Sequence, residues 1–217
     1  FAMCGSWVQE TSLAGASLGT TSYPITDSEI KNSILYQNAF CHGSIMAKKD
    51  DIMQLNGYRE EFKHSQDYDL WLRLIESCKV ANLEEPLYVR TISPESISFA
   101  NKEKQNAYAD LARDCYRARK SKTKEPLHRF ESINRAKSKI NNQNRIHSIY
   151  KFYCGRKLFS HGKMRLARKY FFNSLYLFPF GLKNIIFIFF TLLPQRIRKV
   201  FEKIWLSKKA KYNLRID

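Results

Sequence analysis

The charge of the chain changes sign near residue 100, and this change constrains the fold more than any other feature. Residues 1–100 hold 8 Lys and Arg against 13 Asp and Glu, whereas residues 101–217 hold 29 against 7. The two parts therefore carry net charges of −5 and +22, which together make the overall +17. A mildly acidic globular part followed by a strongly basic one indicates a folded domain with an anchoring appendage.

Length and cysteine content narrow the class further. A chain of 217 residues can bury one good core and a second, small one. Its five cysteines are spread along the chain without a CxxC pair, so the sequence supports neither a disulfide framework nor a zinc site. The chain opens with an apolar, strand-like stretch at residues 1–8, and we expect an N-terminal part of the domain to be missing.

An acidic turn followed by an apolar helical pattern lies at residues 65–74. Leu70, Trp71 and Leu74 recur on one helix face, so residues 65–69 are expected to form the turn that begins the helix. Asp67 and Asp69 would then lie near the free N–H groups of the first turn, which stabilise a negative charge. Either aspartate is simply an N-cap, or the turn holds a carboxylate toward a substrate, and the local sequence leaves both open.

The first hundred residues alternate predicted strands and helices, which indicates an α/β fold. Strands are expected at residues 1–8, 39–47, 79–83 and 87–90, the second interrupted by His42-Gly43-Ser44 and the last two joined by a turn at 84–86. Helices are expected at residues 28–37 and 48–55, with Gly57 suited to a left-handed cap after the second. Residues 91–98 have the polar, proline-containing composition of a mobile loop at the edge of a site.

Beyond residue 101 the pattern becomes helical and basic. Residues 106–119 form one predicted helix, whose apolar stripe is Tyr108, Leu111, Ala112 and Cys115. Residues 149–160 and 164–177 predict a helical hairpin with Gly162 in its turn, which resembles a single tetratricopeptide-like unit. We therefore expect three regions, at residues 1–100, 101–177 and 178–217.

The C-terminal region combines an apolar run with a basic amphipathic pattern. Residues 185–193 are apolar apart from Thr191, but Pro179, Gly181 and Lys183 leave the stretch too short for a bilayer span. Residues 195–211 place apolar and basic side chains on opposite helix faces, which is typical of a helix that lies on anionic lipid. We expect residues 178–211 to hold the protein peripherally at the cytoplasmic face of the inner membrane. The alternative is that this apolar face packs on the preceding helix.

Several motifs in residues 39–98 together resemble the acceptor-side, C-terminal half of a family 2 glycosyltransferase with a GT-A fold. They are His42-Gly43-Ser44, Asn56-Gly57-Tyr58, Gln66-Asp67-Tyr68-Asp69-Leu70-Trp71-Leu72-Arg73-Leu74, Leu87-Tyr88-Val89-Arg90 and Ser96-Ile97-Ser98. The resemblance implies inverting transfer of a sugar from a nucleotide-sugar donor to a glycan or lipid-linked acceptor, in cell-envelope polysaccharide biosynthesis. It also implies a nucleotide-binding half that precedes this sequence, without which the chain is expected to be inactive.

The resemblance assigns a general base to Asp67, at the position where the family usually has Glu-Asp and this chain has Gln66-Asp67. Inverting transfer needs one carboxylate that faces the acceptor hydroxyl, so the departure at Gln66 leaves the base in place. The family also uses a divalent metal, Mg or Mn, bound through a DxD motif at the end of a strand in the nucleotide-binding half. The string Asp67-Tyr68-Asp69 opens a helix instead, so we expect the metal motif outside this chain.

Six further residues are implied as substrate contacts: His42, Gly43, Gln66, Asp69, Arg90 and Ser96. Asp69 is also expected to cap the helix or order the loop, and to pair with Arg73 one turn later. His42 is a donor-side or metal-side ligand, an acceptor contact, or an internally satisfied polar residue. Arg90 contacts the diphosphate, or it forms an ordinary surface salt bridge. The family often has a His two positions after that arginine, where this chain has Ile92.

Two other classes of function remain open from the sequence. One is a non-enzymatic basic module, in which residues 101–217 bind nucleic acid or membrane and the first half is a scaffold. The other is a degenerate transferase that acts only as an interaction partner. We expect a nucleotide-sugar donor, a glycan or lipid-linked acceptor and an anionic membrane surface as partners, and no nucleic acid.

Overall fold

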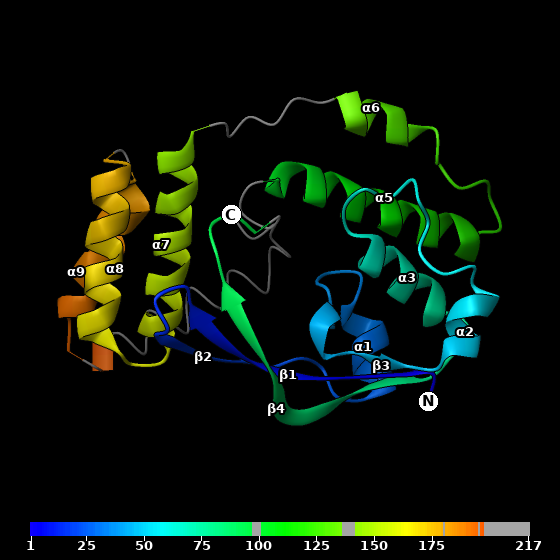
Figure 1. Cartoon of the computed structure of the whole chain (residues 1–217), viewed down its shortest axis with the longest axis horizontal. Coiled ribbons are helices and arrows are strands. Elements are labelled where there is room, and N and C mark those ends of the chain that lie inside the picture. Colours follow the sequence, from blue (N-terminus) through cyan, green and yellow to red (C-terminus); the bar gives the residue numbers. More distant parts are fainter. Residues whose placement is uncertain (97–100, 136–141, 180, 195, 198–217) are drawn as a thin grey trace. The chain divides into compact units, whose positions relative to one another are not determined.

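The computed structural model describes residues 1–96, 101–135, 142–179, 181–194, 196 and 197, which divide into two compact units. The first unit is built from the described residues of Phe1–Glu10, Thr20–Thr91 and Glu95–Asn141. The second is built from those of Thr11–Gly19, Ile92–Pro94 and Asn142–Asp217. The mixture of strands and helices agrees with the predicted α/β class (Figure 1).

The elements follow one another in an order that separates an α/β part from a helical part. They are β1 (Met3–Ser12), β2 (Ser17–Thr21), α1 (Asp27–Ser33), the 3-10 turn η1 (His42–Ser44), β3 (Met46–Ala47), α2 (Lys49–Gln54), α3 (Gln66–Leu74), β4 (Val80–Ile92), α5 (Lys102–Lys120), α6 (Arg129–Arg135), α7 (Gln143–Ser160), α8 (Met164–Leu177) and α9 (Leu182–Leu192).

The sheet is organised around β1, which pairs with each of the other three strands. It runs antiparallel to β3, with Met3 opposite Ala47. α1 begins at a capping box, because the Thr26 hydroxyl accepts the N–H of Glu29 while the Glu29 carboxylate accepts the N–H of Thr26. The helix predicted at residues 28–37 is therefore present and ends earlier, at Ser33.

β4 is one continuous strand of 13 residues, so the turn predicted at residues 84–86 is wrong. Pro86 lacks a backbone N–H, and for this reason the sequence predicts a break between two strands there. The strand is paired with β1, and the side chains of residues 83–87 are exposed, which is the setting in which a strand tolerates proline. The predicted loop at residues 91–98 accordingly begins only after Ile92.

The strand predicted at residues 39–47 is also wrong for most of its length. Its centre forms η1, and only Met46–Ala47 pairs in the sheet as β3. The Ser44 hydroxyl accepts the N–H of Ser6 at 3.2 Å and donates to the carbonyl of Cys41 at 2.9 Å, which holds the turn against β1. Such side-chain hydrogen bonds compete with strand pairing.

The core of the first unit forms between α3 and α5, which lie side by side (Figure 1). The stripe predicted on α5 is confirmed, since Tyr108, Leu111, Ala112 and Cys115 are all fully buried. α6, which the sequence did not predict, adds Phe130 to this core with its ring 4.8 Å from that of Phe62. Residues of α5 and α6 thus belong to the same compact unit as most of the sheet, beyond the boundary expected at residue 100.

The second unit contains the predicted helical hairpin, α7 and α8. Gly162 lies in its turn with φ of 75°, the left-handed region that glycine adopts at low cost. Within the hairpin, the hydroxyls of Ser148 and Ser174 lie 2.9 Å apart, and each also donates to the other residue's carbonyl. Gly155 faces the Phe171 ring, where an added Cβ would lie 2.6 Å from it, so the two helices pack closely there.

α9 covers part of the apolar run that was predicted at the C-terminal end of the chain. Within the described residues no helix combines the length and the apolar character that a membrane span requires. The basic amphipathic helix predicted at residues 195–211 lies outside the described residues, apart from Arg196 and Ile197.

Replacing Leu111 with alanine tests the core between α3 and α5. Leu111 is fully buried, so the cavity left behind should lower the free energy of unfolding by about 2–5 kcal/mol, measured by urea denaturation. The matched control is Leu83→Ala at a half-exposed position of β4, for which a change within about 0.5 kcal/mol is expected. Equal losses in the two variants would contradict this assignment of the core.

Candidate active site

α3 begins earlier than predicted and takes the two aspartates into its first turn. Ser65 is the N-cap residue with a left-handed backbone (φ 56°, ψ 26°), and the helix runs from Gln66. Neither Asp67 nor Asp69 is therefore the N-cap. Asp67 Oδ1 accepts the N–H of Tyr68 at 2.8 Å, so its carboxylate lies at the free N–H groups of the first turn.

A pocket of about 240 Å³ lies beside α3 in the first unit. Three aromatic rings form part of its lining and lie close together. The His42 ring centroid is 6.1 Å from that of Tyr58 and 6.2 Å from that of Trp71. The lining residues are His42, Ile45, Ala47, Ile52, Tyr58, Leu70 and Trp71. The lining therefore combines four aliphatic side chains with three rings, of which His42 and Tyr58 carry exposed polar groups.

Asp67 lies next to this pocket. Leu70 and Trp71, three and four residues later on α3, line the pocket and share one helix face with Asp67. The Asp67 side chain is only partly buried. Burial and the nearby charge of Asp67 together raise the pKa of the Tyr58 phenol, which indicates that the carboxylate and this lining residue are close. An accessible carboxylate thus stands at the edge of an aromatic pocket.

Gly43 allows a close approach, as expected for a glycine at this position, but the neighbour is a side chain of the protein itself. A Cβ at Gly43 would lie 2.4 Å from the ring of Tyr88 on β4. Any larger residue would push this ring away from η1. Gly43 thereby supports the turn that carries His42 into the pocket.

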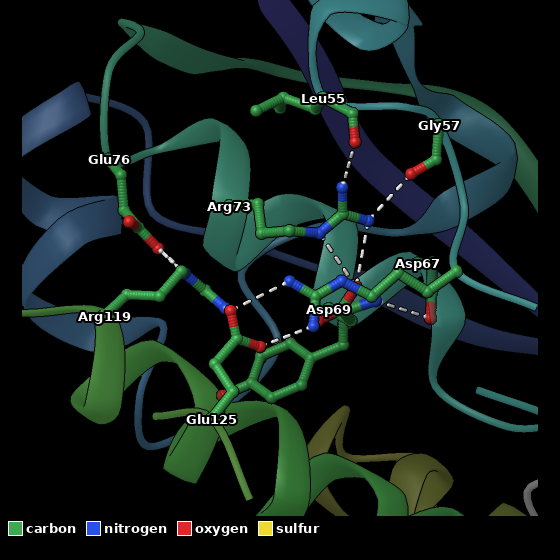
Figure 2. A network of polar contacts seen from close by, with 10 residues as sticks. Leu55, Gly57, Asp67, Asp69, Arg73, Glu76, Arg119 and Glu125 are labelled. Atoms are coloured by element: carbon green, nitrogen blue, oxygen red, sulfur yellow. Dashed lines mark hydrogen bonds and ion pairs between the residues drawn. The ribbon is translucent and has the colours of Figure 1, made fainter. Parts of the chain in front are cut away.

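Asp69 lies inside the unit and not in the pocket. Its side chain is fully buried, and its pairing with Arg73 is confirmed, since Arg73 Nε donates to Asp69 Oδ2 at 2.9 Å. The same guanidinium donates to the carbonyls of Leu55 at 2.7 Å and Gly57 at 2.8 Å (Figure 2). The pair therefore holds the loop that connects α2 to Tyr58 in the pocket.

The ion pair extends into a network of charged side chains that reaches α5. Arg59 Nε lies 3.7 Å from Asp69 Oδ2, and its terminal nitrogens donate to both carboxylate oxygens of Glu125, at 2.6 and 3.2 Å. Arg119 of α5 lies between two carboxylates (Figure 2). Its Nη1 is 3.3 Å from Glu125 Oε1, and its Nη2 is 2.7 Å from Glu76 Oε1. Asp69 is thus surrounded by arginines, whereas Asp67 stands outside the network.

Burial opposes the charges of the central pair. It raises the pKa of Asp69 although Arg73 and Arg59 attract the carboxylate, and it lowers the pKa of Arg73 although Asp69 attracts the guanidinium. Forming such a pair requires the desolvation of two charges. Removing one partner destabilises the fold more, because the remaining charge would be buried alone.

Arg90 lies in β4 and pairs with the fully buried carboxylate of Glu10 in β1. This pairing raises the pKa of Arg90 although burial opposes its charge. Burial raises the pKa of the neighbouring Tyr23 phenol to about 12. The Arg90 side chain as a whole is 37% exposed, while its terminal nitrogens contact Glu10 and the sulfur of Cys41.

The structure brings some of the predicted site residues together and leaves others apart. His42 lines the pocket, Gly43 follows it, and Asp67 with the exposed Gln66 opens the adjacent helix. Asp69 lies in the arginine network, and neither Arg90 nor Ser96 is among the residues that line the pocket. Trp71 was predicted as core, and it is both buried and part of the lining.

Sequence reasoning missed Tyr58 as a pocket residue, although it belongs to the Asn56-Gly57-Tyr58 motif. Both Asn56 and Gly57 have positive φ, of 57° and 62°, so the chain reverses just before this tyrosine. An aromatic residue directly after such a turn is a sequence signal that could have identified Tyr58 as a residue of the site. The charged network could not be inferred from the sequence, since Arg59 lies 60 or more positions before Arg119 and Glu125.

The part of the chain that the structure describes contains no group of three or more His, Cys, Asp or Glu side chains arranged to hold a metal ion. Within Asp67-Tyr68-Asp69, the second carboxylate is already occupied by guanidinium groups. The two aspartates of this string therefore do not fit a bound metal ion.

Comparison with known proteins supports a relationship to glycosyltransferases. The O-antigen biosynthesis glycosyltransferase WbnJ of Escherichia coli is 34% identical over 76 residues, which make up 35% of this chain. The match covers 29% of that protein, so the chain spans less than a third of the relative's length. No family model matches the sequence, and no solved structure matches the chain.

The same substitution at the two aspartates should change the free energy of unfolding by very different amounts. Asp69→Asn removes the buried negative charge that Arg73 requires, and we expect the free energy of unfolding to fall by about 3–5 kcal/mol in urea denaturation. Asp67→Asn keeps an oxygen that can accept the N–H of Tyr68, and we expect a change of about 0.5 kcal/mol or less. Similar losses in both variants would contradict the separation of the two environments.

The network also predicts an acid-sensitive contribution from Glu125. Burial alone would raise the pKa of Glu125, but its hydrogen bonds and charge interactions with Arg59 and Arg119 lower it below the ordinary value. Its stabilising contribution is therefore complete above the ordinary pKa of about 4.3 and is lost as the pH falls through that value toward the lower, folded one.

The measurement is the difference in unfolding free energy between the wild type and Glu125→Gln at pH values from about 7 to 3. This difference should be largest near neutral pH and should shrink below about pH 4.3. The raised pKa of Asp69 makes its own contribution to stability change with pH in the opposite direction. Both proteins contain Asp69, so the difference between them removes this contribution. A difference that does not change with pH would show that Glu125 is not held as an ion.

Proposed function

We propose that this chain provides the acceptor-binding side of an inverting glycosyltransferase of the family 2 type, with a GT-A fold and with Asp67 as general base. The observation that carries the proposal is the position of Asp67, an accessible carboxylate one helical turn before the pocket residues Leu70 and Trp71. The similarity to WbnJ supports the class of reaction.

The proposed step is a single displacement. An acceptor hydroxyl oxygen attacks the anomeric carbon of the donor sugar, and the bond from that carbon to the nucleotide diphosphate oxygen breaks. The hydroxyl proton passes to the Asp67 carboxylate, and the nucleotide diphosphate leaves with the bonding electron pair. The base needs access to solvent and to the acceptor, which Asp67 has and the fully buried Asp69 lacks.

The pocket suits one sugar ring of the acceptor. Its volume of about 240 Å³ is smaller than the roughly 300–1,000 Å³ of pockets that hold drug-sized ligands. The half-exposed Tyr58 offers an apolar ring face, and the exposed His42 can donate to or accept from a sugar hydroxyl. We assign Gln66 to the same acceptor side because it precedes the base at the start of α3.

Donor contacts are proposed for Arg90 and Ser96, which stand apart from this pocket lining. In this proposal the partly exposed Arg90 side chain binds a diphosphate oxygen while Glu10 holds it in place. The divalent metal expected from the family resemblance is proposed to bind through a DxD motif outside this chain, and the step above uses only residues of this chain.

Asp67→Asn in the full-length protein tests the proposed base. We expect sugar transfer to fall about 10²–10⁴-fold because the amide cannot take the proton. Transfer is measured from a panel of radiolabelled nucleotide sugars to membrane-derived acceptor, with circular dichroism to verify the fold.

The matched control is Asp50→Asn, which removes an exposed carboxylate from α2 in the same unit and should leave transfer within about twofold. Retention of full activity by Asp67→Asn would remove this residue as the base. A loss in both variants would point to a general effect of charge.

A further inference from the structure

Helix α9 presents apolar side chains on two opposite faces. Its inner face packs on the α7–α8 hairpin through Phe187, whose ring centroid lies 5.3 Å from that of Phe171, 5.4 Å from Phe152 and 5.6 Å from Phe159. Asn184 and Thr191, at helical spacing from Phe187, are buried on the same side. This face accounts for the attachment of α9 to its own unit.

The opposite face remains uncovered within the described part of the chain. Its five apolar side chains follow helical spacing and are between 43% and 68% exposed: Leu182, Ile185, Ile186, Phe189 and Leu192. We call these residues the α9 outer face. A helix on the surface of a soluble domain normally presents polar side chains to water, so a contiguous apolar face marks an interaction surface.

The charged side chains of the segment that contains α9 have one sign. Residues 142–197 contain no Asp or Glu, whereas ten residues are basic: Arg145, Lys151, Arg156, Lys157, Lys163, Arg165, Arg168, Lys169, Lys183 and Arg196. On the neighbouring helix α8, the exposed positions Arg165, Lys169, Phe172 and Tyr176 form one stripe at spacings of four, three and four residues. Two cations are thus followed by two aromatic rings along the exposed side of α8.

We propose that the α9 outer face docks on the surface of an anionic lipid bilayer. Apolar side chains enter the boundary between headgroups and acyl chains, while flanking Lys and Arg side chains bind lipid phosphates. With 11 residues, α9 is about 16 Å long, roughly half the thickness of the hydrocarbon layer, so it lies on the membrane and does not cross it.

Two other occupants are disfavoured by the same observations. A second copy of the chain would bring two basic surfaces together without any acidic side chain from this region to pair with them. A nucleic acid would use the cations but would leave the five apolar side chains of the outer face in water. The inference does not depend on Asp67 or on the proposed reaction.

Sedimentation of the whole chain with vesicles tests the proposal. The probes are vesicles of phosphatidylcholine with one quarter phosphatidylglycerol, and vesicles of phosphatidylcholine alone. We expect the partition coefficient to be at least about tenfold higher for the anionic vesicles and to fall as salt is added.

The double variant Ile185→Gln and Phe189→Gln should lower partitioning onto anionic vesicles at least about tenfold, which corresponds to about 1.4 kcal/mol. The matched control replaces two similarly exposed apolar residues of β4, Leu87→Gln and Val89→Gln, and should stay within about twofold. All four positions are exposed, and circular dichroism checks that each variant is folded.

Three results would overturn the proposal. The first is equal partitioning of the α9 variant and the wild type. The second is binding to duplex DNA or RNA without binding to anionic vesicles. The third is a dimer in light scattering that the α9 variant dissociates, since the outer face would then be an interface between two copies.

Discussion

The buried ion pair between Asp69 and Arg73 is the interaction on which the candidate site depends. Arg73 binds a carboxylate of its own helix and two carbonyls of the preceding loop, so one guanidinium joins α3 to the segment between Leu55 and Gly57. A planar guanidinium with five donors can do this, whereas a lysine ammonium has neither the shape nor the number of directed donors. The loop leads directly to Tyr58 in the pocket and to Arg59 in the network.

The same helix turn serves two purposes because its aspartates point to different surroundings. Asp69 faces the interior, where arginines surround it, and Asp67 faces the pocket side, where its carboxylate keeps contact with water. The two residues are two positions apart, which on a helix separates side chains by about 200°. A structural aspartate and an accessible one can therefore follow each other closely without sharing an environment. The proposed chemistry at Asp67 relies on the rigidity that Asp69 provides.

Periodicity predicted the elements whose stability is local. The stripe of α5, the hairpin of α7 and α8, and the left-handed turn at Gly57 all follow from side-chain spacing or from glycine, and the structure confirms them. The errors share another origin. Pro86 continues within β4 and residues 42–44 form a 3-10 turn, because pairing with β1 and hydrogen bonds to Ser44 decide these conformations. Such partners are distant in sequence and cannot be inferred from spacing alone.

The sequence by itself determined the α/β character of the first half, the reversal of charge near residue 100, and the candidate residues at the start of α3. These are properties of composition and of neighbours within one or two helical turns. Only the tertiary structure decided which aspartate is buried, which aromatic rings line the pocket, and which face of α9 the described residues leave uncovered. Burial depends on what other segments pack against a side chain, and Glu125 reaches Arg59, 66 positions earlier in the sequence, only after the chain has folded back.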